Sequence, residues 1–230
     1  FGPKRGLTLS ADNHNSVNGA REYARRADAP VAILPLDTDL RLDDAPRRLR
    51  MIESRTPGLL AFPVQSNFSG VRHDLALVVE AQALGFEVML DAAGALNLSL
   101  REHPADFVAL SFYKLFGLPT GLGALVAKRT ALAKLRRPWF AGGTVEFVSV
   151  VHTRHLLREG HDGFEDGTPN FLNTGAVETG FEFLARVPRG ALRRRIEALT
   201  GYFLQHAAAL AHSDGAPLTR FYGPADLIDR

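Results

Sequence analysis

Residues 86–114 read FEVMLDAAGALNLSLREHPADFVALSFYK and contain two short, mostly apolar runs, at residues 86–90 and 106–111. Each run has the length and composition of a buried β-strand. Asp91 directly follows the first run, and Lys114 lies just beyond the second. In an open α/β sheet, ligands bind outside the carboxyl ends of the strands. If the two strands are near neighbours, the acid and the amine therefore face the same crevice.

The rest of the chain alternates short apolar runs with longer amphipathic stretches, which predicts an α/β domain built on a mostly parallel sheet flanked by helices. We expect further strands at residues 31–34, 58–64 and 121–127, helices at residues 46–54, 75–84, 129–136, 170–185 and 189–211, and a loop-rich stretch at residues 138–169. The glycine-rich segment at residues 117–123 precedes a strand. That order is wrong for a dinucleotide fingerprint, so we expect a tight turn beside Lys114.

A chain of 230 residues can bury a sizeable core, so we expect one domain, or one domain and part of another. It begins at Phe1 without a methionine and stops at Arg230 with no terminal signal, which indicates a fragment. Residues 213–217 read as a linker. We therefore assign residues 1–212 to a large domain that lacks its N-terminal start, and residues 213–230 to the linker and the truncated start of a small C-terminal domain.

The composition excludes several classes of function. The absence of cysteine excludes disulfides and thiolate-ligated zinc and is compatible with the cytoplasmic location that we expect. Net charge is only +2, and the arginines at residues 193–195 read as a solvated helix face, so we expect no nucleic-acid partner. No apolar run approaches the roughly 18 residues that cross a bilayer, so we expect no membrane partner. Two histidine groupings, His152 with His155 and His161 with Asp162, are weak metal-binding patterns, and we expect no metal.

Lysine is scarce in this chain, whereas arginine is common: the four lysines are Lys4, Lys114, Lys128 and Lys134. An amine can lose its proton and attack a carbonyl, but a guanidinium stays charged. A pyridoxal cofactor needs a lysine to form an imine with its aldehyde and a carboxylate to keep its pyridine nitrogen protonated. Lys114 and Asp91 match that pair. From the residues alone, a surface lysine and a turn-forming aspartate remain the alternative.

Residues 110–125, LSFYKLFGLPTGLGAL, resemble the Schiff-base segment of class V aminotransferases, which are fold-type I pyridoxal 5'-phosphate (PLP) enzymes. Within that family they resemble above all the desulfurase-like domain of molybdenum cofactor sulfurases, and they are also similar to cysteine desulfurases. Four further motifs occur in the family's order, namely DNHNSV at 12–17, QSNFSG at 65–70, LDAA at 90–93 and FEDGTPN at 164–170. The resemblance implies the large domain of a fold-type I transferase, with three layers in the order α/β/α.

The resemblance also implies PLP as the cofactor and roles for three catalytic residues. Lys114 matches the Schiff-base lysine. Asp91 matches the carboxylate that pairs with the pyridinium nitrogen. His14 matches the histidine that stacks on the pyridine ring.

Three further residues match cofactor-binding positions of the family. Asn67 matches the residue that hydrogen-bonds the phenolic oxygen of the cofactor, and Ser111 matches a phosphate-binding hydroxyl. Thr168 matches a phosphate contact that reaches across from the neighbouring subunit, which implies a homodimer with sites at the interface. Residues 142–144 resemble the loop near that contact.

Two positions depart from the cysteine desulfurase pattern. Gly94 stands where desulfurases usually have a glutamine, and Tyr113 stands where they have a histidine. Both departures favour the molybdenum cofactor sulfurase branch. The family has an upstream phosphate-binding loop and a small C-terminal domain, and neither has a counterpart in this sequence. In the family, the small domain supplies a substrate-binding arginine and, in desulfurases, the persulfide cysteine.

We therefore expect a PLP-dependent enzyme, cysteine desulfurase-like or molybdenum cofactor sulfurase-like, that binds a small amino acid as an external aldimine. L-cysteine is the candidate substrate. One alternative is an aminotransferase, epimerase or lyase of the same group that acts on another amino compound. Another is an inactive binding protein that has kept the fold, although the presence of Lys114, Asp91, His14 and Asn67 argues against it.

Overall fold

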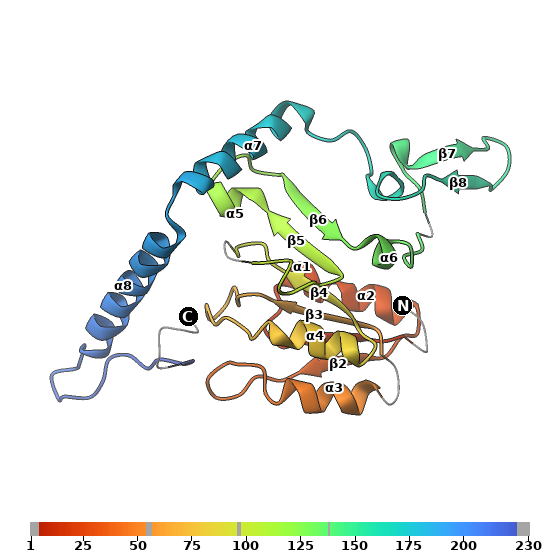
Figure 1. Ribbon diagram of the computed structural model, residues 1–230. Coiled ribbons are helices and arrows are strands. Elements are labelled where there is room, and N and C mark those ends of the chain that lie inside the picture. The colour runs from red at the N-terminus through yellow and green to blue at the C-terminus, as the bar shows by residue number, and fades with distance from the viewer. Residues whose placement is uncertain (1–4, 54–56, 96–97, 138, 225–230) are drawn as a thin grey trace.

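A six-stranded sheet forms the centre of the computed structural model, which describes residues 5–53, 57–95, 98–137 and 139–224. Its strand order is β2-β1-β3-β4-β5-β6 (Figure 1). The strands are β1 Leu7–Ser10, β2 Val31–Leu34, β3 Leu59–Pro63, β4 Glu87–Asp91, β5 Phe107–Ser111 and β6 Gly123–Ala127. The first five run parallel, and β6 is antiparallel to β5. The expected mostly parallel sheet is confirmed.

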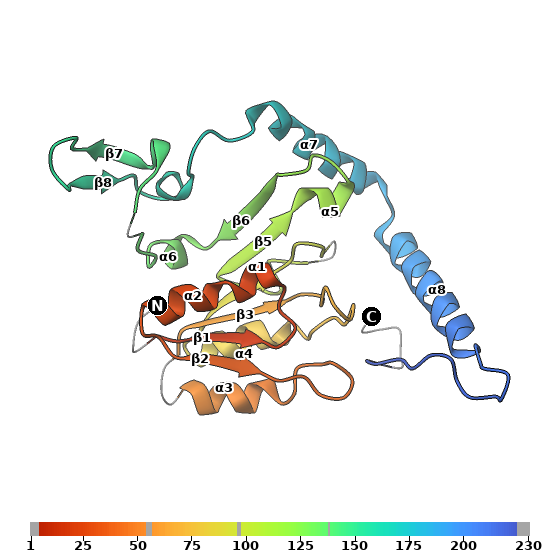
Figure 2. The ribbon, with the colours of Figure 1, turned by 180° about the vertical axis from the view of Figure 1, so that it is seen from behind.

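Helices cover both faces of the sheet, which gives the expected three layers. Figure 1 shows the helices α3 (Ala45–Glu53) and α4 (Ala76–Ala83) on one face, and Figure 2 shows α1 (Asn15–Asn18) and α2 (Ala20–Arg26) on the other. Residues of β3 alternate between two buried clusters. Leu60 packs in the α3–α4 cluster, while Ala61 packs in the α1–α2 cluster. This alternation is the period of two that a strand buried on both faces requires.

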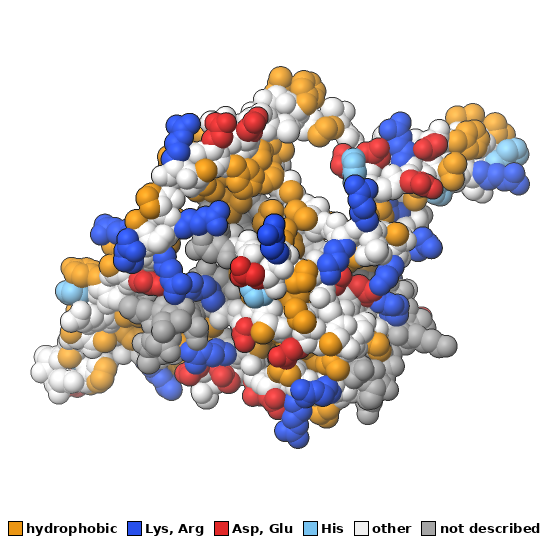
Figure 3. Space-filling view, in the orientation of Figure 1, with side chains coloured by type: hydrophobic (Ala, Val, Ile, Leu, Met, Phe, Trp, Pro, Cys, Tyr) orange, Lys and Arg blue, Asp and Glu red, His pale blue; other side chains and the backbone are white. Residues whose placement is uncertain are grey.

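Within the described residues, the second half of the chain adds four helices and a two-stranded hairpin. They are α5 (Phe112–Phe116), α6 (Arg129–Leu132), β7 (Val145–Val148), β8 (His155–Leu157), α7 (Phe171–Arg186) and α8 (Arg189–Ala208), with 3-10 turns at Gly142–Thr144 and Asp162–Phe164. α7 packs on α5 through the rings of Phe112, Phe116 and Phe181, whose centroids are 5.5–6.0 Å apart. Figure 3 shows hydrophobic side chains gathered where these two helices meet. In Figure 1, α8 extends away from the sheet.

The expected elements agree with the structure in the first half of the chain and less well in the second. Helix 129–136 was predicted too long: α6 ends at Leu132, because only Ala131 of this segment is buried and a short helix needs packing to persist. The stretch 138–169 contains the hairpin β7–β8, which a register shift between Val145 and Phe147 interrupts. The last helix ends at Ala208 and not at residue 211.

Three elements near the start were not predicted, namely β1 and the helices α1 and α2. β1 carries polar Thr8 and Ser10, yet both are buried, because the strand lies between β2 and β3. The final residue of the expected helix 46–54 lies outside the described residues. Within the described part of the chain, no helix is both long enough and apolar enough to cross a bilayer.

Candidate functional site

Asp91 and Lys114 lie at the same edge of the sheet, because β4 and β5 are parallel neighbours. Asp91 ends β4 and is in register with Ala109 of β5. After Ser111, which is still extended, the chain turns at once into the short helix α5, and Gly117 ends that helix with a φ of 90°. A positive φ suits glycine and is unfavourable for other residues. The expected juxtaposition of the acid and the amine is confirmed, with Lys114 in the turn of helix that follows β5.

A cavity of about 710 Å³ opens at this edge of the sheet. Its walls include five of the six residues that the sequence pointed to, namely His14, Asn67, Asp91, Ser111 and Lys114. They come from four separate segments: the turn before α1, the loop after β3, the end of β4, and the β5–α5 junction. Pockets for cofactors and small ligands have volumes of roughly 300–1,000 Å³, so the cavity is large enough for a molecule the size of PLP.

The two charged groups of the cavity have few protein partners. The Ala93 N–H donates to Asp91 Oδ1 over 3.0 Å, which fixes the carboxylate at the strand end. Within the described residues, the amine of Lys114 has no hydrogen-bond or ion-pair partner. Gly94 lies beside it, since a Cβ at that position would be 4.0 Å from Lys114 Cδ. The amine is therefore accessible to a ligand.

His14 is held as the N-cap of α1. Its Nδ1 accepts a hydrogen bond from the Ser16 N–H at 3.2 Å and lies 2.8 Å from Ser16 Oγ. Because Nδ1 accepts from an amide, the proton of a neutral ring is on Nε2. Asn13 anchors the preceding turn, donating from Nδ2 to the carbonyls of Ser10 and Ala61 at 3.1 and 2.9 Å. Ser16 thus orients the imidazole at Nδ1, while Asn13 holds the turn that carries His14.

Asn67 lies in a tight loop between β3 and α4. The Ser66 N–H donates to the Val71 carbonyl at 2.8 Å, and the Gln65 side chain donates to the Gly70 carbonyl at 2.7 Å. Gly70 has a φ of 77°, which closes the loop. Asn67 is exposed near the tip and reaches the cavity from there.

Thr168 is not brought to the cavity. It is exposed in the loop after Gly167 and does not line the cavity wall. Residues 142–144 lie next to that loop, because a Cβ at Gly142 would be 3.1 Å from the Gly167 nitrogen. The role expected for Thr168 across a dimer interface stays a prediction.

The sequence reasoning missed a buried ion pair beside the cavity. His73 Nε2 lies 2.8 Å from Asp12 Oδ2, with the two side chains 1% and 2% exposed. Burial opposes the charge of Asp12, but the hydrogen bond and the charge of His73 outweigh it, so the pKa of Asp12 is below its ordinary value. The two residues are far apart in the chain, and neither belongs to a local pattern that would have paired them.

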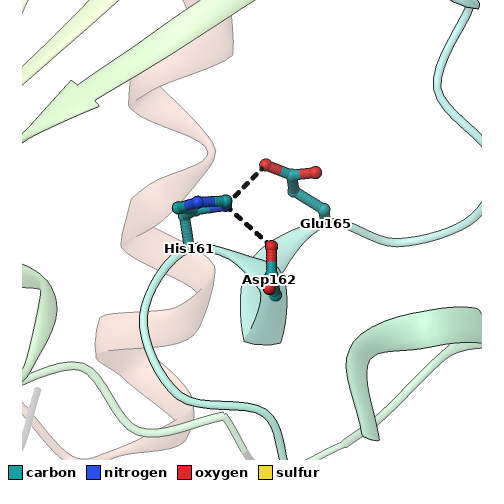
Figure 4. A group of neighbouring side chains, drawn as sticks. All are labelled: His161, Asp162 and Glu165. Carbon is teal, nitrogen blue, oxygen red and sulfur yellow. Dashed lines mark hydrogen bonds and ion pairs between the residues drawn. The ribbon is translucent and has the colours of Figure 1, made fainter.

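Figure 4 shows the cluster of potential metal ligands that the described residues contain: His161, Asp162 and Glu165. His161 Nδ1 lies 2.9 Å from Asp162 Oδ1 and 3.2 Å from Glu165 Oε1. All three side chains are exposed, and an ion pair accounts for the geometry. The other histidine grouping differs, because the His155 ring packs on Phe140 with centroids 4.7 Å apart. The absence of a metal stays a prediction.

The model of the class V aminotransferase family matches residues 1–223. Molybdenum cofactor sulfurase 3 of Aedes aegypti is 36% identical over 100% of this chain and 32% of its own length. The molybdenum cofactor sulfurase of Homo sapiens is 34% identical over 94% of this chain and 26% of its own length. The chain thus spans about a third or less of the length of these curated relatives.

Solved structures of cysteine desulfurases share the fold. CsdA of Escherichia coli superposes with a TM-score of 0.75 and 26% identity, over 89% of this chain and 52% of the desulfurase. The apo enzyme of Thermococcus onnurineus NA1 superposes with a TM-score of 0.79 and 25% identity, over 98% of this chain and 55% of that chain. The expected fold class is confirmed, and the chain covers about half of each structure.

Proposed function

This chain belongs to the class V aminotransferase family, whose cofactor is PLP, and we propose that its cavity binds PLP for sulfur transfer from an amino acid. The observation that carries the proposal is the meeting of Lys114 and Asp91 in one cavity with His14 and Asn67. The amine of Lys114 suits the aldehyde of PLP, and the carboxylate of Asp91 suits its ring nitrogen. The imidazole of His14 suits the ring face, and the amide of Asn67 suits the phenolic oxygen. Ser111, at the same edge, supplies a hydroxyl for the phosphate.

Each group has a distinct task in this proposal. Bound PLP supplies an electron sink for the substrate carbons. Lys114 would hold the cofactor through its amine and would move a proton to or from the substrate. Asp91 keeps the ring nitrogen protonated. His14 fixes the plane of the ring, and the Nε2 proton of neutral His14 is then available as a donor.

The proposed substrate is L-cysteine, because the similar proteins include molybdenum cofactor sulfurases and cysteine desulfurases. The C–S bond of cysteine would break as a thiolate attacks the sulfur. The acceptor becomes a persulfide, and the substrate carbon keeps the electron pair and takes up a proton to give alanine. The chain contains no cysteine, so the accepting thiol belongs to another segment or another molecule.

Two finer assignments belong to the same proposal. We assign residues 1–212 to the cofactor-binding domain and residues 213–230 to the connection with a second domain. Thr168, which is exposed and outside its own cavity, contacts the phosphate in the cavity of a second copy, so that the working unit is a homodimer. The exposure of the Thr168 loop supports this assignment.

The test uses the full-length protein and two lysine variants. The parent protein incubated with PLP should absorb in the visible range, and Lys114→Ala should abolish the band. Lys134→Ala is the matched control, because Lys134 pairs with Glu87 outside the cavity. Sulfide and alanine released from cysteine would support desulfuration, whereas an oxo acid formed from an amino acid would identify an aminotransferase. A parent protein that stays colourless with PLP would overturn the proposal.

A further inference from the structure

The buried ion pair of Asp12 and His73 connects the two loops that carry His14 and Asn67. Asp12 lies in the turn after β1, two positions before His14. His73 lies at the base of the loop that follows β3, and Asn67 lies near the tip of that loop. The two loops meet where His73 Nε2 approaches Asp12 Oδ2 to 2.8 Å, and Ser66 of the second loop also hydrogen-bonds to Asp12.

Both ends of this connection are anchored to the sheet. In the first turn, the Ala11 N–H donates to the Leu34 carbonyl at 2.9 Å, next to the Asn13 contacts described above. In the second loop, the His73 N–H donates to the Val64 carbonyl at 3.2 Å, and Gln65 and Arg72 form a β-bridge. The ring of His73 also packs edge-on against Phe62, with centroids 6.4 Å apart. Each partner of the pair therefore belongs to an ordered loop, and the pair joins the two loops to each other.

Neither Asp12 nor His73 lines the cavity, so neither is placed to touch a ligand there. A buried polar pair of this kind is also a weak source of stability, because the desolvation of its groups offsets their attraction. Apolar residues of similar volume often replace such a pair with no loss of stability. A role for the pair in geometry accounts for its position better than a role in folding free energy does.

We propose that Asp12 and His73 are positioning residues that set the separation of His14 and Asn67 across the cavity. The inference rests on the proposed function, since it takes the face and the phenolic edge of PLP as the groups that those two residues meet. Losing the pair allows the Asn67 loop to shift relative to the His14 turn. The cofactor then binds less tightly and in a changed environment, while the fold persists.

The decisive variant replaces both partners at once, in the full-length protein. Asp12→Ala with His73→Leu leaves no unpaired buried charge and keeps the summed side-chain volume close to that of the pair. We expect its unfolding midpoint to stay near that of the parent, its affinity for PLP to fall about tenfold, which corresponds to 1.4 kcal/mol, and its bound-cofactor absorption maximum to shift. Asp12→Asn, which keeps an oxygen for the Nε2–H of His73, should restore most of the affinity.

Asp106→Asn is the matched control. Asp106 is a less deeply buried carboxylate that also has a basic partner, Lys128, but it lies at the opposite edge of the sheet. Its variant should lose stability and keep the PLP affinity and the absorption maximum of the parent.

The outcomes separate this inference from the function on which it rests. A parent protein that binds no PLP contradicts the proposed function itself. A parent that binds PLP, with a folded double variant of equal affinity and an unchanged spectrum, overturns the positioning role. If the double variant does not fold, Asp12→Asn decides the matter through its PLP affinity and spectrum. An Asp12→Asn variant that folds but binds PLP about tenfold more weakly than the parent would contradict a role based on the hydrogen bond.

Discussion

Gly94 lies against the side chain of Lys114, so that a Cβ at position 94 would be 4.0 Å from Lys114 Cδ. That distance is an ordinary van der Waals contact. The position therefore accepts a methyl group, while a longer side chain would extend into the space around the amine.

Gly94→Ala and Gly94→Gln should separate these two effects. We expect the alanine variant to keep the PLP affinity within about twofold, a change of less than 0.5 kcal/mol. The glutamine variant places an amide beside Lys114 and should shift the absorption maximum of the bound cofactor. Spectral titration with PLP checks both. If the two variants have the same PLP affinity and the same absorption maximum, Gly94 does not lie beside Lys114.

Ser16→Ala tests how His14 is oriented. The variant removes the hydroxyl 2.8 Å from Nδ1 but leaves the backbone N–H that donates to the same nitrogen. The loss of one hydrogen bond is worth about 0.5–1.5 kcal/mol, so we expect PLP to bind roughly 2–12-fold more weakly. His14→Ala is the reference for complete loss of the ring and should weaken binding further. If Ser16→Ala binds PLP more weakly than His14→Ala does, the Ser16 hydroxyl has a role other than orienting His14.

Gly180→Ala tests the packing of α7 on α5. A Cβ at Gly180 would overlap the ring of Phe116. Overpacking costs about 1–3 kcal/mol, which exceeds the gain in helix propensity of roughly 1 kcal/mol. Gly175→Ala on the same helix meets nothing within 4 Å and should be stabilising. Urea unfolding of the two variants should give opposite signs, and a stabilising Gly180→Ala would contradict this packing.

Asp106→Asn should make stability less dependent on pH. Burial opposes the charge of Asp106, but hydrogen bonds from Gln82, the Val88 N–H and Lys128 outweigh it and lower its pKa from 3.8. A group with a lowered pKa in the folded state stabilises the protein above its unfolded-state pKa, and this contribution is lost as pH falls through the folded-state pKa. The variant should cost about 1–3 kcal/mol near neutral pH and progressively less below about pH 4. A cost that stays constant in urea unfolding down to about pH 2 would contradict this account.

The sequence predicted the meeting of Asp91 and Lys114 better than it predicted the loops around them. Asp91 and Lys114 each follow an apolar strand that the sequence shows clearly. The two strands are parallel neighbours, so their carboxyl ends, and the two residues, lie at the same edge of the sheet. β1 was missed because it is four residues long and half polar, and its burial comes from strands on both sides. The ion pair of Asp12 with His73 depends on two loops meeting, which no local pattern encodes.

The covalent attachment of PLP to Lys114 is the central claim, and reduction followed by peptide mapping tests it most directly. The full-length protein is incubated with PLP, reduced with borohydride and digested, and the modified peptide is identified by mass spectrometry. We predict a pyridoxyl group on Lys114 and none on Lys128 or Lys134. A modification spread over the other lysines, or a protein that binds PLP and leaves Lys114 unmodified, would contradict the account.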